Sequence, residues 1–215
     1  GWLINPNKGY DGAQVAYTNG KLALTTGFGQ LNGNEAGLAD KDLYFAQGAY
    51  NFGFAKLDVN YFATKESNDN DEVYGIGLNV PVQKFNVFGE YWKNTTAKDY
   101  DTAWNAGLSY GKADWKKAGT WDLPVSYNDV DQNVYFGGGT WHNDMLKNLT
   151  GAAIVKDSTV HYLTATNLTF WNVLANVTLQ KNVQLHAEYA FGADAEGTNG
   201  VDPDDSWTVS LNYKF

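Results

Sequence analysis

Ionisable and amide side chains occupy every second position in several segments. These are the residue types of this chain that could bind ions and polar solutes or take part in catalysis. Lys56, Asp58 and Asn60 are two residues apart. His186 and Glu188 have the same spacing. A spacing of two places side chains on one face of a β-strand, and charged side chains on the wall of a wet channel set its ion preference. The candidate wall residues are Lys56, Asp58, Asn60, Glu90, Trp92, Asp122, His186, Glu188 and Lys214. The alternative is that these side chains only keep the wall hydrated and do not affect which ions pass.

Catalysis and metal binding are not favoured by the remaining polar residues. The three histidines, at positions 142, 161 and 186, show no metal-ligand spacing. The chain has no Cys, which excludes a thiol nucleophile, a disulfide and a Cys-ligated metal. His186 and Ser210 are expected on one face of neighbouring strands, but nothing ties them to the acid of a Ser–His–acid set. We therefore predict no enzyme activity, no metal and no cofactor.

The charge balance restricts the partners. The formal net charge is −9, and all 15 basic residues are lysines. This excludes a nucleic-acid partner, because phosphate binding requires a basic patch, whereas an acidic channel mouth concentrates cations. Acidic residues also cluster in two stretches predicted as loops, namely Asp69, Asp71 and Glu72, and Asp194, Glu196, Asp202, Asp204 and Asp205. They complete no calcium-loop pattern, so we expect a solvated acidic rim.

Alternation of apolar and polar residues extends along almost the whole chain and predicts β-strands. In the final segment, apolar residues occupy the odd positions from Trp207 to Phe215 and polar residues occupy the even ones. About eleven strands are predicted, over 12–18, 21–29, 43–51, 54–64, 73–80, 85–93, 103–110, 118–127, 163–179, 183–192 and 206–215. The segment 163–179 is longer than the ~10 residues of one membrane-crossing strand, which leaves its boundary open.

The connections between these segments alternate between short and long. Short turns are expected at Asn19-Gly20, 51–53, 81–84, 111–114 and 180–182, and long polar loops near 30–41, 65–72, 94–102, 129–159 and 193–205. This alternation predicts a meander with tight turns at one rim and long loops at the other. The longest loop, 129–159, contains a stretch over 144–155 that could form a short helix. The loop either folds inward and narrows a lumen, or packs outward on its neighbours or a partner subunit.

The two faces of the predicted strands differ in chemistry. One face is apolar and carries aromatic residues near the strand ends, namely Phe54, Tyr61, Phe85, Tyr91, Trp104, Tyr110, Tyr127, Tyr189, Trp207 and Phe215. The other carries charges such as Lys56, Asp58 and Glu90, which are costly in a dry sandwich core but not in a wet lumen. No stretch reaches the ~18 apolar residues of a transmembrane helix. We therefore predict an all-β fold, a transmembrane antiparallel up-and-down β-barrel.

The C-terminal segment resembles the insertion signal of bacterial outer-membrane barrels, which ends in Phe after alternating aromatic residues. The matching positions are Trp207, Val209, Leu211, Tyr213 and Phe215. The stretch 1–29 resembles the porin barrels of S-layer-homology-tethered outer-membrane proteins, although no S-layer-homology segment is visible. The resemblance implies a bacterial outer-membrane location, contact with outer-membrane lipids, recognition by the barrel assembly machinery and a homotrimer.

These observations lead to one expectation for residues 1–215. They form a single outer-membrane barrel domain, the C-terminal part of a 12–16-stranded barrel that lacks N-terminal strands; alternatively, residues 2–4 close a twelve-stranded barrel. The expected function is diffusion of small polar solutes and ions with a mild cation preference. Three alternatives remain. They are a sugar channel with Phe62, Phe88 and Trp92 as a sliding surface, a structural or adhesive barrel, and a soluble carbohydrate-binding sandwich.

Overall fold

The computed structural model describes residues 10–31, 41–66, 69–134, 144–149 and 154–214. One antiparallel sheet contains β1 (Tyr10–Thr18), β2 (Leu22–Leu31), β3 (Asp42–Asn51), β4 (Lys56–Glu66), β5 (Asp69–Val82), β6 (Phe85–Asn94), β7 (Thr102–Gly111), β8 (Trp121–Asp131), β11 (Asn167–Gln180), β12 (Val183–Glu196) and β13 (Ser206–Tyr213). The connection from β8 to β11 contains the 3₁₀-helices η1 (Gln132–Val134) and η2 (Asp144–Leu149) and a hairpin of β9 (Ile154–Lys156) and β10 (Thr159–His161). Among the described residues, no helix is long and apolar enough to cross a membrane.

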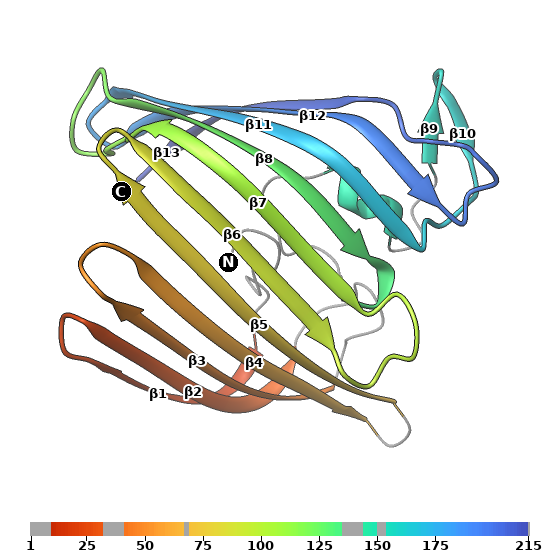
Figure 1. Ribbon diagram of the computed structural model, residues 1–215, viewed down its shortest axis with the longest axis horizontal. Coiled ribbons are helices and arrows are strands. Elements are labelled where there is room, and N and C mark those ends of the chain that lie inside the picture. Colours follow the sequence, from red (N-terminus) through yellow and green to blue (C-terminus); the bar gives the residue numbers. More distant parts are fainter. Residues whose placement is uncertain (1–9, 32–40, 67–68, 135–143, 150–153, 215) are drawn as a thin grey trace.

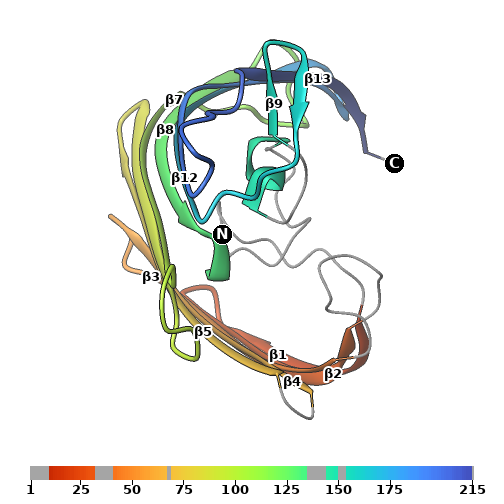
Figure 2. The ribbon, with the colours of Figure 1, turned by 90° about the vertical axis from the view of Figure 1, so that its right-hand side faces the viewer.

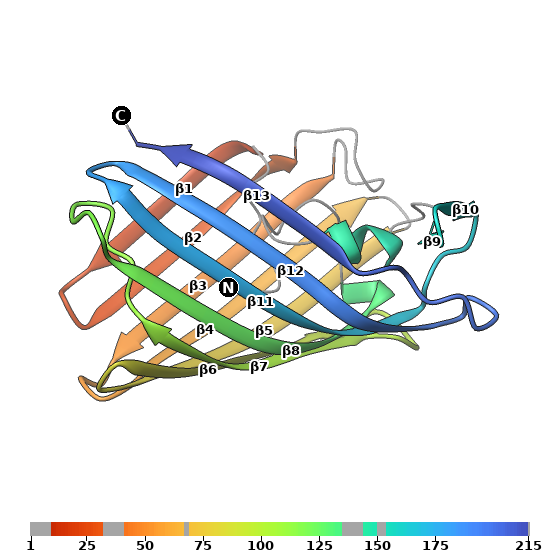
Figure 3. The same ribbon diagram turned by 90° about the horizontal axis from the view of Figure 1, so that it is seen from above.

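The eleven strands follow one another across the sheet in chain order, so the sheet is an up-and-down meander. Figure 1 and Figure 3 show long strands in a strongly curved sheet, and Figure 2 shows the sheet bent around an interior. The sheet is open, because in the described part of the chain β1 and β13 are its two unpaired edges. Since neighbours alternate in direction, the first and eleventh strands of the sheet run the same way.

The predicted strands are confirmed, because each expected segment overlaps one strand of the sheet. Several boundaries differ, most of all at β5, β8, β11 and β12. β8 begins at Trp121 rather than at 118, because Thr120 belongs to the preceding turn. Its Oγ1 donates to the carbonyl of Lys117 at 2.7 Å and accepts the N–H of Asp114 at 2.9 Å. β11 begins at Asn167, which fixes the boundary that the segment 163–179 left open.

Four of the five expected tight turns are confirmed at one rim, and the first of them is shifted by a single residue. The expected short turn at 111–114 is wrong, because β7 ends at Gly111 and β8 begins only at Trp121, which makes this connection nine residues long. In the β1–β2 turn, the side-chain oxygen of Asn19 accepts the N–H of Leu22 at 2.9 Å, and Gly20 has φ +85°. The two central residues are therefore Gly20 and Lys21, one position later than the Asn-Gly pair suggests. Glycine at the first central position supplies the positive φ that a two-residue hairpin turn needs there.

Two connections at the loop rim differ from expectation. The segment 65–72 is not a long loop, because β4 continues to Glu66 and β5 begins at Asp69. The loop 129–159 is partly regular, because β8 continues to Asp131 and the β9–β10 hairpin turns on Asp157 and Ser158, with φ +50° and +60°. The helix expected over 144–155 is a 3₁₀-helix that ends at Leu149. Polar side chains alone do not show where a strand ladder stops.

The convex face of the sheet is apolar and carries two rows of aromatic side chains. In the turn-side row, ring centroids lie 5.0 Å apart for Phe85–Tyr110 and 5.6 Å for Tyr110–Trp121. In the loop-side row, they lie 4.9 Å apart for Tyr61–Tyr74, 5.6 Å for Trp104–Tyr127 and 5.2 Å for Tyr127–Trp171. Exposed aliphatic residues of the same face include Val59, Ile76, Leu78, Val87, Leu108 and Leu123.

The spacing of the two rows repeats from strand to strand. Tyr110 follows Trp104 on β7 by six residues, and Tyr127 follows Trp121 on β8 by six. Six residues of extended chain span about 20 Å. The convex face therefore presents an apolar band bordered by aromatic rings on both sides, and several large apolar side chains on it are about half exposed.

Candidate functional site

The concave face carries the polar side chains that the alternation predicted. Eight of the nine expected wall residues lie on β4, β6, β8 and β12 at even-numbered positions, namely Lys56, Asp58, Asn60, Glu90, Trp92, Asp122, His186 and Glu188. The antiparallel register keeps them on one face, since Asp58 opposes Gly77 and Gly77 opposes Glu90. The ninth, Lys214, follows β13, and its Nζ lies 4.2 Å from the ring centroid of Trp115 at the rim of tight turns.

A hydrogen-bonded chain crosses three strands of this face. Asn176 on β11 donates through Nδ2 to Oδ1 of Asp122 on β8 at 2.7 Å, and its Oδ1 lies 2.7 Å from Nδ1 of His186 on β12. Since an amide oxygen only accepts, His186 carries a proton on Nδ1. Its Nε2 lies 3.9 Å from Oε2 of Glu188, whose Oε1 accepts from Asn172 Nδ2 at 2.9 Å. The structure therefore brings Asp122, His186 and Glu188 together. The sequence predicted that the three side chains share a face of the sheet, but not that they lie close to one another.

Phe88 and Trp92 lie against the wall rather than projecting from it. A Cβ on Gly107 would lie 2.3 Å from the Phe88 ring, and a Cβ on Gly75 would lie 2.3 Å from the Trp92 ring. The two side chains are only 3% and 4% exposed, and the indole N–H of Trp92 donates to Glu90 at 3.0 Å. Glycine on one strand thus makes room for an aromatic ring from the next. The rings offer a solute little contact area.

Substitution of Gly75 by alanine tests this packing. The new methyl group would overlap the Trp92 ring, and overpacking of this kind costs about 1–3 kcal/mol of unfolding free energy. The matched control is Gly48→Ala, where the nearest atoms are methyl groups of Val59 and Leu24 at 3.3 and 3.4 Å, which need to move only slightly. Urea unfolding, followed by Trp fluorescence, gives both values. Equal losses from the two variants would contradict the ring-on-glycine packing.

η2 packs on part of the concave face near the loop rim. Its Met145, Leu146 and Leu149 are almost fully buried in an apolar cluster. The wall and η1 contribute Trp92, Ala103, Val130, Val134, Leu168 and Phe170 to this cluster. Figure 2 and Figure 3 show η2 inside the curve of the sheet. Within the loop 129–159, η2 therefore packs inward, whereas the narrowing of a lumen stays a prediction.

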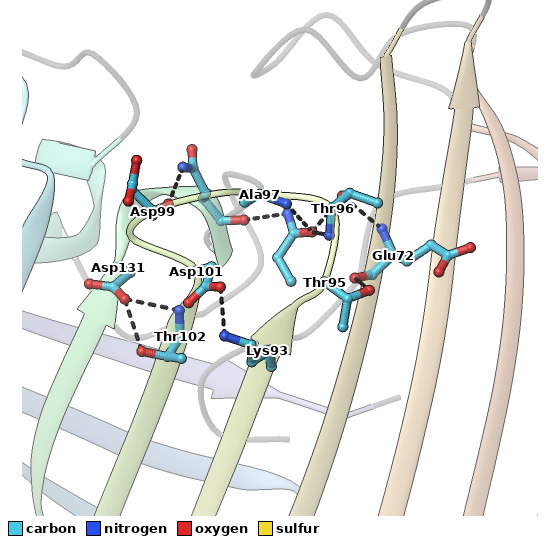
Figure 4. Close-up of polar contacts among 11 residues, drawn as sticks. Glu72, Lys93, Thr95, Thr96, Ala97, Asp99, Asp101, Thr102 and Asp131 are labelled. Atoms are coloured by element: carbon cyan, nitrogen blue, oxygen red, sulfur yellow. Dashed lines mark hydrogen bonds and ion pairs between the residues drawn. The ribbon is translucent and has the colours of Figure 1, made fainter.

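The rim beside η2 is held by backbone and side-chain hydrogen bonds (Figure 4). Lys93 Nζ lies 2.6 Å from Asp101 Oδ2, and Asp131 accepts from the N–H and the hydroxyl of Thr102 at 2.9 Å each. Asn133 donates to the carbonyl of Asp99 at 2.7 Å, next to the buried Val134 of the apolar cluster. The β6–β7 loop thus fixes η1, and η1 supports the surface on which η2 packs.

Apart from Asn60, which was expected, the amides of the wall are functional candidates that the sequence did not reveal. Asn105, Asn128 and Asn172 share the concave face with Glu90 and Glu188, and their strand positions have the same alternation that revealed the charged residues. The side-chain oxygens of Asn105 and Asn172 are buried and accept no hydrogen bond among the described atoms. Buried acceptors of this kind are usually satisfied by ordered water. In the described residues, His, Asp and Glu form no group of three able to hold a metal ion.

The residues of the expected C-terminal insertion signal lie on the other face of the sheet. Trp207, Val209, Leu211 and Tyr213 are exposed on the convex face of β13, and Phe215 and residues 2–4 lie outside the described residues. No protein-family model matches the chain, and a search of curated proteins finds no match. The chemistry of the two faces of this curved sheet is therefore the main indication of its function.

Proposed function

We propose that the chain forms the β-barrel of a bacterial outer-membrane diffusion channel, which passes small polar solutes and ions along the concave face. The proposal rests on the difference in polarity between the two faces of the sheet. The convex face presents an apolar band between two aromatic rows, as lipid-facing barrel surfaces do, whereas the concave face carries hydrogen-bonded carboxylates, amides and an imidazole. A single curved sheet with these faces does not favour a two-layer soluble sandwich.

Closure of the sheet is part of the proposal. Two long unpaired edges such as β1 and β13 are open to edge-to-edge aggregation, and a closed barrel removes both. Because β1 and β13 run in the same direction, fully antiparallel closure needs an odd number of further strands between them. This agrees with a barrel of twelve or more strands. We further propose that the assembly machinery reads the convex residues of β13, that outer-membrane lipids cover the apolar band, and that the barrel is a homotrimer.

The charges of the wall support a mild cation preference. Asp58 and Lys56 lie on the concave face of β4, two residues apart, with opposite charge. An ion passing about 10 Å from one unit charge in water gains or loses about 0.4 kcal/mol, which corresponds to roughly a factor of two in permeability. We expect Asp58→Asn to lower the cation-to-anion permeability ratio about two-fold and Lys56→Gln to raise it by a similar factor.

Planar bilayers in a KCl gradient test both the channel and its selectivity. The purified protein, with every strand that closes the barrel present, is expected to give step-like conductance and a cation-selective reversal potential, measured at low salt because screening removes the effect of wall charges. Opposite shifts for Asp58→Asn and Lys56→Gln support a passage along β4. The absence of conductance, or an anion-selective unsubstituted channel, would contradict the proposal. The buried rings of Phe88 and Trp92 do not favour the sugar-channel alternative. A current that is blocked by added sugars would support that alternative.

A further inference from the structure

A group of lysines lies at the rim of short turns, next to the ends of β6, β7, β11, β12 and β13. Three belong to the β7–β8 connection, and the others come from the β5–β6 turn, the β11–β12 turn and the position after β13. Asp114 is the only Asp or Glu in these segments. The six side chains are exposed and together define a basic rim; they are Lys84, Lys112, Lys116, Lys117, Lys181 and Lys214.

Backbone hydrogen bonds bring the β7–β8 connection to the β11–β12 turn. The N–H of Gly119 donates to the carbonyl of Thr178 at 2.8 Å, at the end of β11. The N–H of Asn182, which follows Lys181, donates to the carbonyl of Trp115 at 2.7 Å. Figure 1 and Figure 3 show the connection beside this turn. The lysines of the two segments therefore share one surface, although they are far apart in the chain.

The first and last lysines of the basic rim are held to the same segments. The N–H of Lys214 donates to the carbonyl of Asn182 at 3.0 Å, and its Nζ lies 4.2 Å from the ring centroid of Trp115. On the other side, the N–H of Gly111 donates to the carbonyl of Lys84 at 2.8 Å. The net charge of −9 hides this surface, because its lysines come from four separate segments.

The basic rim adjoins the apolar band of the convex face. Lys84 directly precedes Phe85 of the turn-side aromatic row, and Lys214 directly follows Tyr213, which is 57% exposed on the convex face. One residue of extended chain spans about 3.3 Å. The lysines therefore begin where the aromatic border of the band ends, which is the level of lipid headgroups beside a membrane barrel.

We propose that the basic rim binds the phosphate groups of anionic phospholipids in the periplasmic leaflet, and this inference rests on the proposed barrel, whose short turns face the periplasm. Each lysine near a membrane surface strengthens the attraction of anionic lipid about five-fold. The loop rim has the opposite charge, with acidic clusters over 69–72 and 194–205. Charge therefore directs anionic headgroups to the turn rim and away from the loop rim.

The test is native mass spectrometry of the whole protein in detergent micelles that contain equal amounts of phosphatidylglycerol and phosphatidylcholine. We expect the first bound lipid to be phosphatidylglycerol in clear excess, and the excess to fall with added salt because screening weakens the attraction. Lys116→Glu combined with Lys117→Glu is expected to lower the excess at least about five-fold. The matched control is Lys65→Glu combined with Lys98→Glu, which makes the same change in net charge at exposed positions near the loop rim.

The outcomes separate this inference from the channel proposal. A loss of the excess in the Lys116/Lys117 variant, with little change in the control, supports the basic rim. Equal losses in both variants, or no excess in a protein that still conducts in bilayers, overturn the rim and leave the channel intact. Displacement of phosphatidylglycerol by an equal concentration of glycerol phosphate would assign the rim to soluble phosphates and overturn the lipid assignment. If the unsubstituted protein neither folds into vesicles nor conducts, both proposals fail.

Discussion

Replacement of Val59 by lysine is expected to cost about 2–4 kcal/mol of unfolding free energy in a bilayer, the penalty for a charge near the middle of a barrel's lipid face. Val59 lies on the convex face of β4 and is 47% exposed. It is two residues from Tyr61 of the loop-side aromatic row, within the apolar band. An ammonium group there loses its hydration without gaining a partner. Urea titration of the folded fraction in lipid vesicles, read from heat-dependent gel mobility, measures the cost.

The matched variant is Asn60→Lys, one residue further along β4 and on the concave face. Asn60 donates to the Asp58 carboxylate at 3.3 Å, so a lysine at this position would meet an opposite charge in a wet environment. We expect a change below about 0.5 kcal/mol, as for other surface substitutions. Equal tolerance of both lysines would show that both faces are in water, and equal losses would show that neither is. Either outcome would contradict the assignment of the convex face to lipid.

Replacement of Leu146 by aspartate is expected to release η2 from the wall and to widen the passage. Leu146 is 0% exposed in the apolar cluster, where an unpaired carboxylate costs several kcal/mol. The remaining buried side chains of η2, chiefly Met145 and Leu149, are not expected to offset this cost. Because a helix with its side chains is about 10 Å wide, its release is expected to raise single-channel conductance about two-fold and to admit larger solutes. Single-channel recording and liposome swelling with sugars of increasing size measure the two effects.

Val160→Asp is the control for this experiment. Val160 lies on β10, in the same connection between β8 and β11, and it is 49% exposed, so the introduction of aspartate there removes much less packing than at Leu146. We expect native conductance and a native size limit. Native conductance in Leu146→Asp, with native gel mobility, would show that η2 does not narrow the passage. A change in Val160→Asp equal to that in Leu146→Asp would assign the effect to added charge at the rim.

Most of the fold was predictable because the signal of a β-meander is local. Alternation with a period of two is a property of neighbouring residues, and it placed all eleven strands and the two faces, including the side on which Lys56, Asp58 and Glu90 lie. The β1–β2 turn was visible to within one residue, because only a few residue types adopt the backbone of a tight turn. Strand ends were less accurate, as at Glu66 and Asp69, because a ladder continues while the partner strand supplies hydrogen bonds.

The sequence alone therefore determined the order of the strands and the chemistry of each face. Only the tertiary structure decided which wall residues meet, because the contact of Asp122 with Asn176 and of Asn176 with His186 depends on the register of three strands. It also decided that η2 packs inside the curve and that Trp92 lies flat over Gly75. These contacts join residues far apart in the chain, and they are set by packing volume and sheet curvature rather than by the spacing of neighbouring residues.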